Sequence, residues 1–289
     1  RLKRMWREER IECLERMQYL ESIQHLETLA EFCQRTEGFS RNSLPLQGDF
    51  CTSPGLGQKV DETGWFKPYR GNTVIFRLGD VEYKQQKGRH SPAKMQAQIE
   101  GIKTRLYARC GNMLAEPLPQ CTFHITLHDL QSEGGAGSPE FIDQMEKSGR
   151  KAREIISGFR KYFHEPLRLR GTWVFNLVNT SIVLGFRPED EDSCRRLMAM
   201  YQELQAAAFL PYPLTPHVTL AYYRPGAYGQ EDLERLRQFL EEENQQTFEI
   251  MEDSAPSVQS RSRMGKDGLV VNLDFSDLAY AEFLDMKDF

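Results

Sequence analysis

The chain has 289 residues, of which 39% are hydrophobic and 27% charged, so it is long enough for one sizeable domain with an appended segment. Its formal net charge of −5 argues against binding along a long nucleic-acid duplex, which needs clustered lysine and arginine. No apolar run reaches the roughly 18 residues of a membrane-spanning helix, so we expect no membrane partner.

Residues 1–36 predict an amphipathic helical segment. Apolar residues recur roughly every three positions from Leu14 to Phe32, which is the spacing of one helix face. This segment can dock on the rest of the chain, associate with a second copy or bind a protein partner, and the sequence leaves the three open. Residues 37–65 are rich in Gly, Pro and polar residues, which predicts a linker or a surface wrap. Residues 66–289 form the expected catalytic domain.

The first half of that domain predicts a strand, a helix and a second strand. Residues 73–78 are mostly β-branched, aromatic or aliphatic, as in a strand. Ser91-Pro92 is a typical helix start, and apolar residues from Met95 to Leu106 then recur at intervals of three and four. The string Cys121-Thr-Phe-His-Ile-Thr-Leu-His128 follows, and its β-branched and apolar residues predict a strand.

The first half continues with a helix over 141–163 and a strand over 169–177, which forms a hairpin with the strand 180–186. The second half repeats this order with different residues. Its expected elements are the strand 180–186, a helix over 192–209, a strand in Leu214-Thr-Pro-His-Val-Thr-Leu-Ala221, a helix over 231–244, and strands at 248–250 and 269–273. Each half thus reads strand, helix, His-Thr strand, helix, strand. We expect an α+β fold, bilobal and pseudo-symmetric, in which two antiparallel sheets face a central cleft and helices pack outside.

Both strings contain His-x-Thr-Leu, with His124 and Thr126 in the first and His217 and Thr219 in the second. Side chains two apart on a strand point to the same face, about 6 to 7 Å from each other. A single His-x-Thr string is usually structural, but its repetition at equivalent places favours a shared site. There, one neutral imidazole can take up a proton while a protonated one returns one, and hydroxyls can hold an anionic oxygen.

The paired strings, each preceded and followed by a helix, resemble the two-histidine (2H) phosphoesterase superfamily, which includes cyclic phosphodiesterases and enzymes acting on 2′-5′ linked RNA. The resemblance extends from Phe66 to the C-terminus, and the stretch GWFKPYRGNT from Gly64 to Thr73 is similar to the opening of one branch. It implies the bilobal fold and a phosphoesterase activity carried by the two His-Thr pairs. It leaves the substrate open, because the superfamily uses the same four side chains on RNA ends, cyclic nucleotides and oligonucleotides.

Further residues are candidates for substrate contacts. Strand alternation places His128 on the face of His124, and Tyr222 and Tyr223 alternate after the second motif, so one tyrosine should flank the cleft and stack on a base. A buried histidine and a core tyrosine are the structural alternatives. The candidates for substrate binding are Tyr69, Arg70, Asn72, His128, Tyr222 and Tyr223.

We expect neither a metal nor a cofactor. The spacing of His124 and His128 would suit a zinc pair on a helix, but on a strand it is too wide for one ion. The six cysteines show no CxxC spacing, which is typical of free thiols in a reducing compartment. No signal peptide heads the chain, so the expected location is the cytoplasm.

The sequence therefore predicts a metal-independent phosphodiesterase that cleaves a short nucleotide substrate by two-histidine general acid and base catalysis. The leading substrates are a 2′,3′-cyclic phosphate at an RNA end or on a nucleotide, a cyclic oligonucleotide and a 2′-5′ linkage. The alternative is a nucleotide-binding sensor without turnover that signals through the N-terminal helical segment. Intact His and Thr at all four positions favour the enzyme, because a sensor has no need of two proton-transfer groups.

Overall fold

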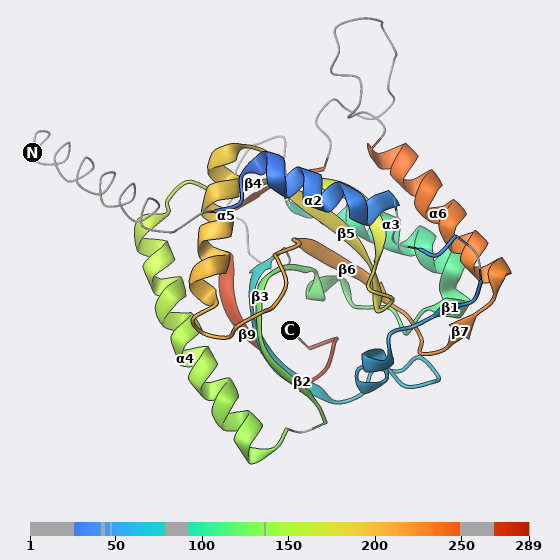
Figure 1. Cartoon of the computed structure of the whole chain (residues 1–289), viewed down its shortest axis with the longest axis horizontal. Coiled ribbons are helices and arrows are strands. Elements are labelled where there is room, and N and C mark those ends of the chain that lie inside the picture. Colours follow the sequence, from blue (N-terminus) through green and yellow to red (C-terminus); the bar gives the residue numbers. More distant parts are fainter. Residues whose placement is uncertain are drawn as a thin grey trace, which may run out of the picture.

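The structure is a computed structural model that describes residues 26–41, 44–46, 48–78, 92–135, 137–248 and 269–288. Its elements in chain order are α2 (Leu29–Arg41), β1 (Phe50–Cys51), η1 (Pro54–Gln58), β2 (Tyr69–Arg77), α3 (Pro92–Cys110), η2 (Gly111–Met113), η3 (Gln120–Thr122), β3 (His124–Gly134), α4 (Pro139–Tyr162), β4 (Leu167–Leu177), β5 (Ser181–Pro188), α5 (Glu191–Leu204), β6 (His217–Tyr222), β7 (Ala227–Tyr228), α6 (Gln230–Phe248), β8 (Val270–Leu273) and β9 (Leu278–Phe283) (Figure 1).

Two antiparallel sheets carry the motif strands. One has the order β3-β2-β9 and the other the order β6-β5-β4-β8. Each motif strand, β3 or β6, is an edge strand of its sheet, and the two contact each other near the middle of the molecule (Figure 1). This arrangement confirms the predicted α+β fold.

Helices cover the two sheets. α4 packs along β2, β3 and β9, whereas α3 contacts β6, and α6 contacts β4 and α3 (Figure 1). α2 and α5 both pack against β4 and β5. β4, expected in the first half, pairs instead with β5 and β8 in the second sheet.

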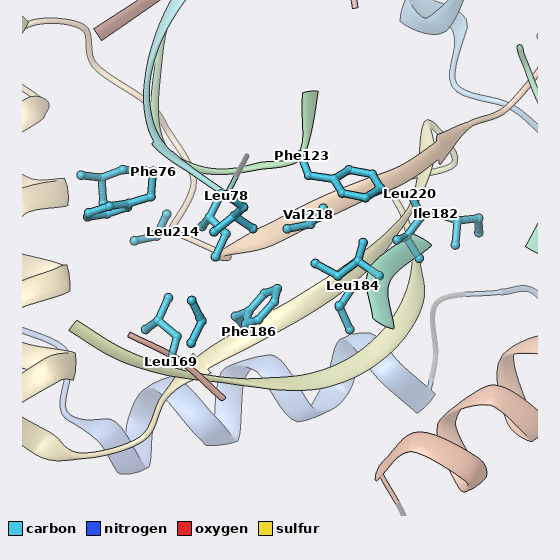
Figure 2. Close-up of a cluster of buried hydrophobic side chains, with 14 of the residues drawn as sticks. Phe76, Leu78, Phe123, Leu169, Ile182, Leu184, Phe186, Leu214, Val218 and Leu220 are labelled. Atoms are coloured by element: carbon cyan, nitrogen blue, oxygen red, sulfur yellow. The ribbon is translucent and has the colours of Figure 1, made fainter. Parts of the chain in front are cut away.

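The packing of β6 in the core of the four-stranded sheet explains which way the side chains of the second motif point. Figure 2 shows Ile182 and Leu184 of β5 beside Val218 and Leu220 of β6, and all four are 0% exposed. These β6 residues alternate with His217 and Thr219. Burying one face of a strand fixes its register, so the same alternation that buries Val218 turns the histidine and threonine to the opposite face.

The predicted hairpin between β4 and β5 is confirmed. Val178 and Asn179 both have positive φ, 45° and 56°, as a two-residue turn of the type that matches strand twist requires. Asn179 tolerates this backbone because its short polar side chain bonds locally, here to Asn176 at 2.8 Å.

Several element boundaries differ from the prediction. The third helix, α5, ends at Leu204 and not near Phe209, because the Gln205 side chain accepts a hydrogen bond from the Leu210 backbone and closes a turn. α6 continues to Phe248, which was expected to begin a strand; Asn244 holds it to β4 through hydrogen bonds to both backbone groups of Val174. Residues 249–250 of that expected strand lie outside the described residues.

Three strands were not predicted. β9 reads Leu-Ala-Tyr-Ala-Glu-Phe, and its alanines and glutamate have low strand propensity, so only the pairing with β2 makes it a strand. β1 and β7 have two residues each, which is too short for a sequence pattern.

The N-terminal helical segment is described only in part, because the prediction for residues 1–25 lies outside the described residues. α2 begins at Leu29 and runs to Arg41, five residues past the expected end, and residues 26–28 before it are not helical. Phe32 is fully buried in the main core, so this part of the segment is docked on the fold. None of the helices that the structure describes is long and apolar enough to cross a membrane.

Candidate active site

The two motif strands border one cavity of about 710 Å³. His124 and Thr126 reach it from β3, and His217 and Thr219 reach it from β6. Two imidazoles and two hydroxyls from distant parts of the chain therefore share one space. That is the arrangement which the paired strings predicted.

Both histidines are held in the same way. The Nδ1 atom of His124 lies 2.7 Å from the backbone oxygen of Thr122, and Nδ1 of His217 lies 2.7 Å from the backbone oxygen of Thr215. A carbonyl oxygen only accepts, so Nδ1 carries the proton in each neutral ring. This leaves Nε2 as the basic nitrogen of both imidazoles.

Burial shifts both imidazoles toward the neutral form. Burial and, to a smaller extent, the proximity of His217 lower the pKa of His124 to about 4, although the hydrogen bond to the Thr122 oxygen opposes the shift. Burial also lowers the pKa of His217, against the opposing effects of the Thr215 carbonyl and the Asp129 carboxylate. The two rings are therefore uncharged near pH 7 when no ligand is bound.

Each motif strand contains a β-bulge at the leucine that follows the threonine. On β3, Thr126 pairs with Ile75 and His128 pairs with Val74, so Leu127 has no partner on β2. On β6, Thr219 and Ala221 pair with consecutive residues of β5, and Leu220 is skipped in the same way. An extra residue in one strand reverses the alternation of side chains beyond it.

The bulges bear on two predicted residues beyond the motifs, His128 and Tyr223. His128 borders the cavity but is only 1% exposed, and its ring packs 5.0 Å from that of Tyr201 on α5. Tyr223 is 0% exposed and packs against Phe50 in the core, away from the cavity. The bulge turns Tyr223 into the core, whereas His128 still contributes to the cavity wall although its ring is buried.

Because of the bulges, Asp129 and Tyr222 point to the same side as the histidine and threonine of their strands, and both line the cavity. Asp129 is the only carboxylate among the described residues of the cavity wall, and its charge raises the pKa of His217. Tyr222 was one of the two predicted tyrosines, whereas the sequence analysis missed Asp129. The sequence does contain a signal for Asp129: it lies three residues after Thr126, just as Tyr222 lies three residues after Thr219.

The structure places the three candidates at the start of β2 in different surroundings. Tyr69 lines the cavity and stacks on Phe283 at 6.4 Å. Asn72 also borders the cavity, but its amide is committed to the fold: it donates to the backbone oxygen of Met145 and accepts from the Gln131 backbone, both at 2.9 Å. Arg70 is not part of the cavity wall.

Lys59 is a second residue that the sequence analysis missed. It reaches the cavity from the segment expected to be a linker or surface wrap, and it is the only lysine or arginine among the described residues of the wall. Across the described ranges, no three His, Cys, Asp or Glu side chains are grouped so as to hold a metal ion.

Comparison with known proteins supports the fold. No protein-family model and no curated protein matches the chain. A conserved protein of unknown function from Agrobacterium tumefaciens, ATU0111, is 20% identical, with a TM-score of 0.54 over 83% of this chain and 91% of that one. TT0787 of Thermus thermophilus is 17% identical over 74% of this chain and 83% of that one, with a TM-score of 0.31.

LigT of E. coli, solved in complex with 3′-AMP, is 14% identical over 55% of this chain and 83% of that one, with a TM-score of 0.32. Of these three structures, ATU0111 alone has a TM-score above 0.5, and at 20% identity this likeness concerns the fold. With its two antiparallel sheets and its paired His-x-Thr strands at one cavity, the chain has the α+β fold that the sequence predicted.

Proposed function

We propose that the chain is a metal-independent phosphodiesterase that cleaves a short nucleotide substrate through His124 and His217. The observation that carries the proposal is the matched pair of imidazoles, each with Nδ1 committed to a backbone carbonyl in one cavity. Such a pair offers two Nε2 atoms for proton transfer at one reacting centre. General acid and base assistance of this kind is typically worth about 10² to 10⁴-fold in rate.

The proposed step on a 2′,3′-cyclic phosphate is an in-line displacement by water. One neutral imidazole takes a proton from the water as its oxygen bonds to phosphorus. The bond from phosphorus to one ribose oxygen breaks, and that oxygen takes a proton from the other imidazole, which enters the step protonated. The negative charge of the bound phosphate favours this singly protonated pair, because an anion raises the pKa of nearby histidines.

The hydroxyls and the cavity size support the same class of substrate. Thr126 and Thr219 are placed in the wall to donate hydrogen bonds to non-bridging phosphoryl oxygens, where charge grows during the reaction. A cavity of about 710 Å³ lies in the usual range for small-molecule sites, roughly 300 to 1,000 Å³. It suits a mononucleotide or dinucleotide.

The test is turnover in the presence of EDTA. The substrates are 2′,3′-cyclic nucleotides, 2′-5′ and 3′-5′ dinucleotides and cyclic dinucleotides. His124→Ala and His217→Ala should each abolish most of the activity seen in the parent protein. His164→Ala is the matched control, because His164 is an exposed histidine outside the cavity wall and its loss should leave activity unchanged.

The alternative, a sensor that binds nucleotide without turnover, gives a different result. It predicts saturable binding of a panel member with no product from any of them. Activity that survives in both cavity variants, or that EDTA removes, would also overturn the proposal.

A further inference from the structure

The backbone on both sides of Lys59 is held in place by packing and hydrogen bonds. It follows η1, and its backbone oxygen accepts a hydrogen bond from Lys67 N at 2.9 Å. Leu56 and Val60 on either side are 1% and 0% exposed, and Val60 bridges to Phe66. The backbone under Lys59 is therefore anchored on both sides, so its side chain is directed into the cavity by the fold itself.

The ammonium group of Lys59 lies among aromatic rings. Its Nζ is 4.9 Å from the ring centre of Tyr69 and 5.7 Å from that of Tyr222. Within the part of the chain that the structure describes, Lys59 takes part in no ion pair. The attraction of a cation to an aromatic ring offsets only part of the cost of removing a charge from water.

The charge of Lys59 persists in these surroundings. Burial acts to lower the pKa of its ammonium, but Tyr222, Tyr69 and the Asp129 carboxylate together outweigh that effect and raise the pKa above its ordinary value. The cavity thus holds a permanent cation beside two imidazoles that are neutral when it is empty. A partly desolvated cation without a paired anion is a ready site for an anionic ligand.

We propose that Lys59 binds a non-bridging phosphoryl oxygen of the substrate on the Thr219 side of the cavity. Tyr222 connects the two residues: its ring lies under the ammonium, and its phenol interacts with the Thr219 side chain. Lys59 and Thr219 can therefore hold the same phosphoryl group. This inference rests on the proposed phosphodiesterase function and adds a substrate-binding cation to the two His-Thr pairs.

The test uses Lys59→Met, which keeps the length of the side chain and removes the charge. Inorganic phosphate is the probe for binding, measured by calorimetry, and 2′,3′-cyclic AMP is the probe for turnover. We expect Lys59→Met to weaken phosphate binding by about tenfold or more, the value of one charge-assisted hydrogen bond. KM should rise more than kcat falls, because the contact exists before and during the reaction.

Two further variants distinguish the effect of a positive charge in the cavity from that of a positive charge on the surface. Lys59→Arg should retain phosphate affinity within about threefold, since the cation is kept. Lys67→Met removes a lysine from the same segment, but Lys67 is exposed and lies outside the cavity wall, so affinity should be unchanged. Selective acetylation of the wild-type protein gives a readout independent of any variant's folding: phosphate should protect Lys59 and not Lys67.

The outcomes distinguish this inference from the proposed function. Equal phosphate affinity in wild type and Lys59→Met, or no protection of Lys59, would overturn the inference even if the wild type turns over its substrates. Loss of phosphate binding in Lys59→Met, together with no turnover of any substrate by the wild type, would uphold the anion site and overturn the phosphodiesterase. No binding of phosphate by the wild type would overturn the inference.

Discussion

The two motif strands are alike up to the bulge and differ after it. On β3 and β6 alike, the histidine bonds through Nδ1 to the carbonyl two residues earlier, the threonine faces the cavity, and the next leucine is skipped in the ladder. The third residue after the threonine is Asp129 on β3 and Tyr222 on β6. One strand thus brings a carboxylate to the cavity, and the other brings a phenol.

The residues that the two strands share serve proton transfer, whereas the residues in which they differ serve to orient a substrate. The shared part supplies two imidazoles and two hydroxyls, which a displacement at phosphorus uses symmetrically. The unshared part makes the cavity electrically asymmetric, with Asp129 on the β3 side and Tyr222, under the Lys59 ammonium, on the β6 side.

The largest effect should come from breaking the shared histidines. His124→Ala and His217→Ala should each lower kcat by about 10² to 10⁴-fold, because each ring transfers one proton per turnover. The double variant should be little worse than either single one, since the two rings act as one unit. Steady-state kinetics on 2′,3′-cyclic AMP measures this, and multiplicative losses in the double variant would contradict it.

Replacing the threonines tests the next shared element. Thr126→Val and Thr219→Val keep the shape of the side chain and remove the hydroxyl, so kcat should fall by about 10² in each case. Thr219→Val should cost more than Thr126→Val, because Thr219 also interacts with the Tyr222 phenol. An equal or reversed order would show that the phenol contact has no part in catalysis.

Acid should weaken the fold through the buried histidines. The pKa of His124 is about 4 in the folded chain, against 6.5 as its ordinary value, so the unfolded chain takes up a proton below pH 6.5 that the folded chain does not accept until about pH 4. The free energy of unfolding should therefore fall as the pH is lowered across this window, by at most about 1.4 kcal/mol per pH unit from this group.

Urea unfolding between pH 7 and pH 4 measures that dependence. His124→Gln should flatten it, since the group that titrates is removed. His217→Gln should flatten it as well, because burial lowers the pKa of His217 too. A slope that both variants share with the wild type would show that neither ring is held neutral by the fold.

Replacing the residues in which the two strands differ, Asp129 and Tyr222, should have a smaller effect on activity. The Asp129 carboxylate raises the pKa of both histidines, so Asp129→Asn should move the acidic limb of kcat/KM to lower pH. Tyr222→Phe is the equivalent change on β6, and it should leave that limb in place. We expect activity at pH 7 to change by less than about tenfold in either variant, because neither residue transfers a proton in the proposed step.

The smallest effect should come from Tyr223, which the bulge places in the core. Its hydroxyl is buried and has no hydrogen-bond partner among the described residues. Tyr223→Phe removes this unsatisfied group, so the free energy of unfolding should stay the same or rise by up to about 1 kcal/mol. Activity should be unchanged, and a loss of turnover in this variant would place Tyr223 at the site.

Much of the fold could be predicted because its signals are local. Helix and strand periodicity located α3, α4, β4, β5 and the two motif strands, and the repeated His-x-Thr-Leu string indicated that β3 and β6 share a site. β9 could not be found in this way, since Ala279, Ala281 and Glu282 do not favour a strand until β2 pairs with them.

The sequence by itself determined the four side chains of the proposed catalytic set, because two residues spaced by two on a strand share a face wherever that strand is placed. The tertiary structure decided which neighbours join them. A bulge forms where pairing with the neighbouring strand skips a residue of the motif strand, so only pairing with β2 and β5 turned Asp129 and Tyr222 inward and buried His128 and Tyr223. Lys59 enters the cavity only because its segment is anchored beside the motif strands, a long-range packing effect that no local pattern encodes.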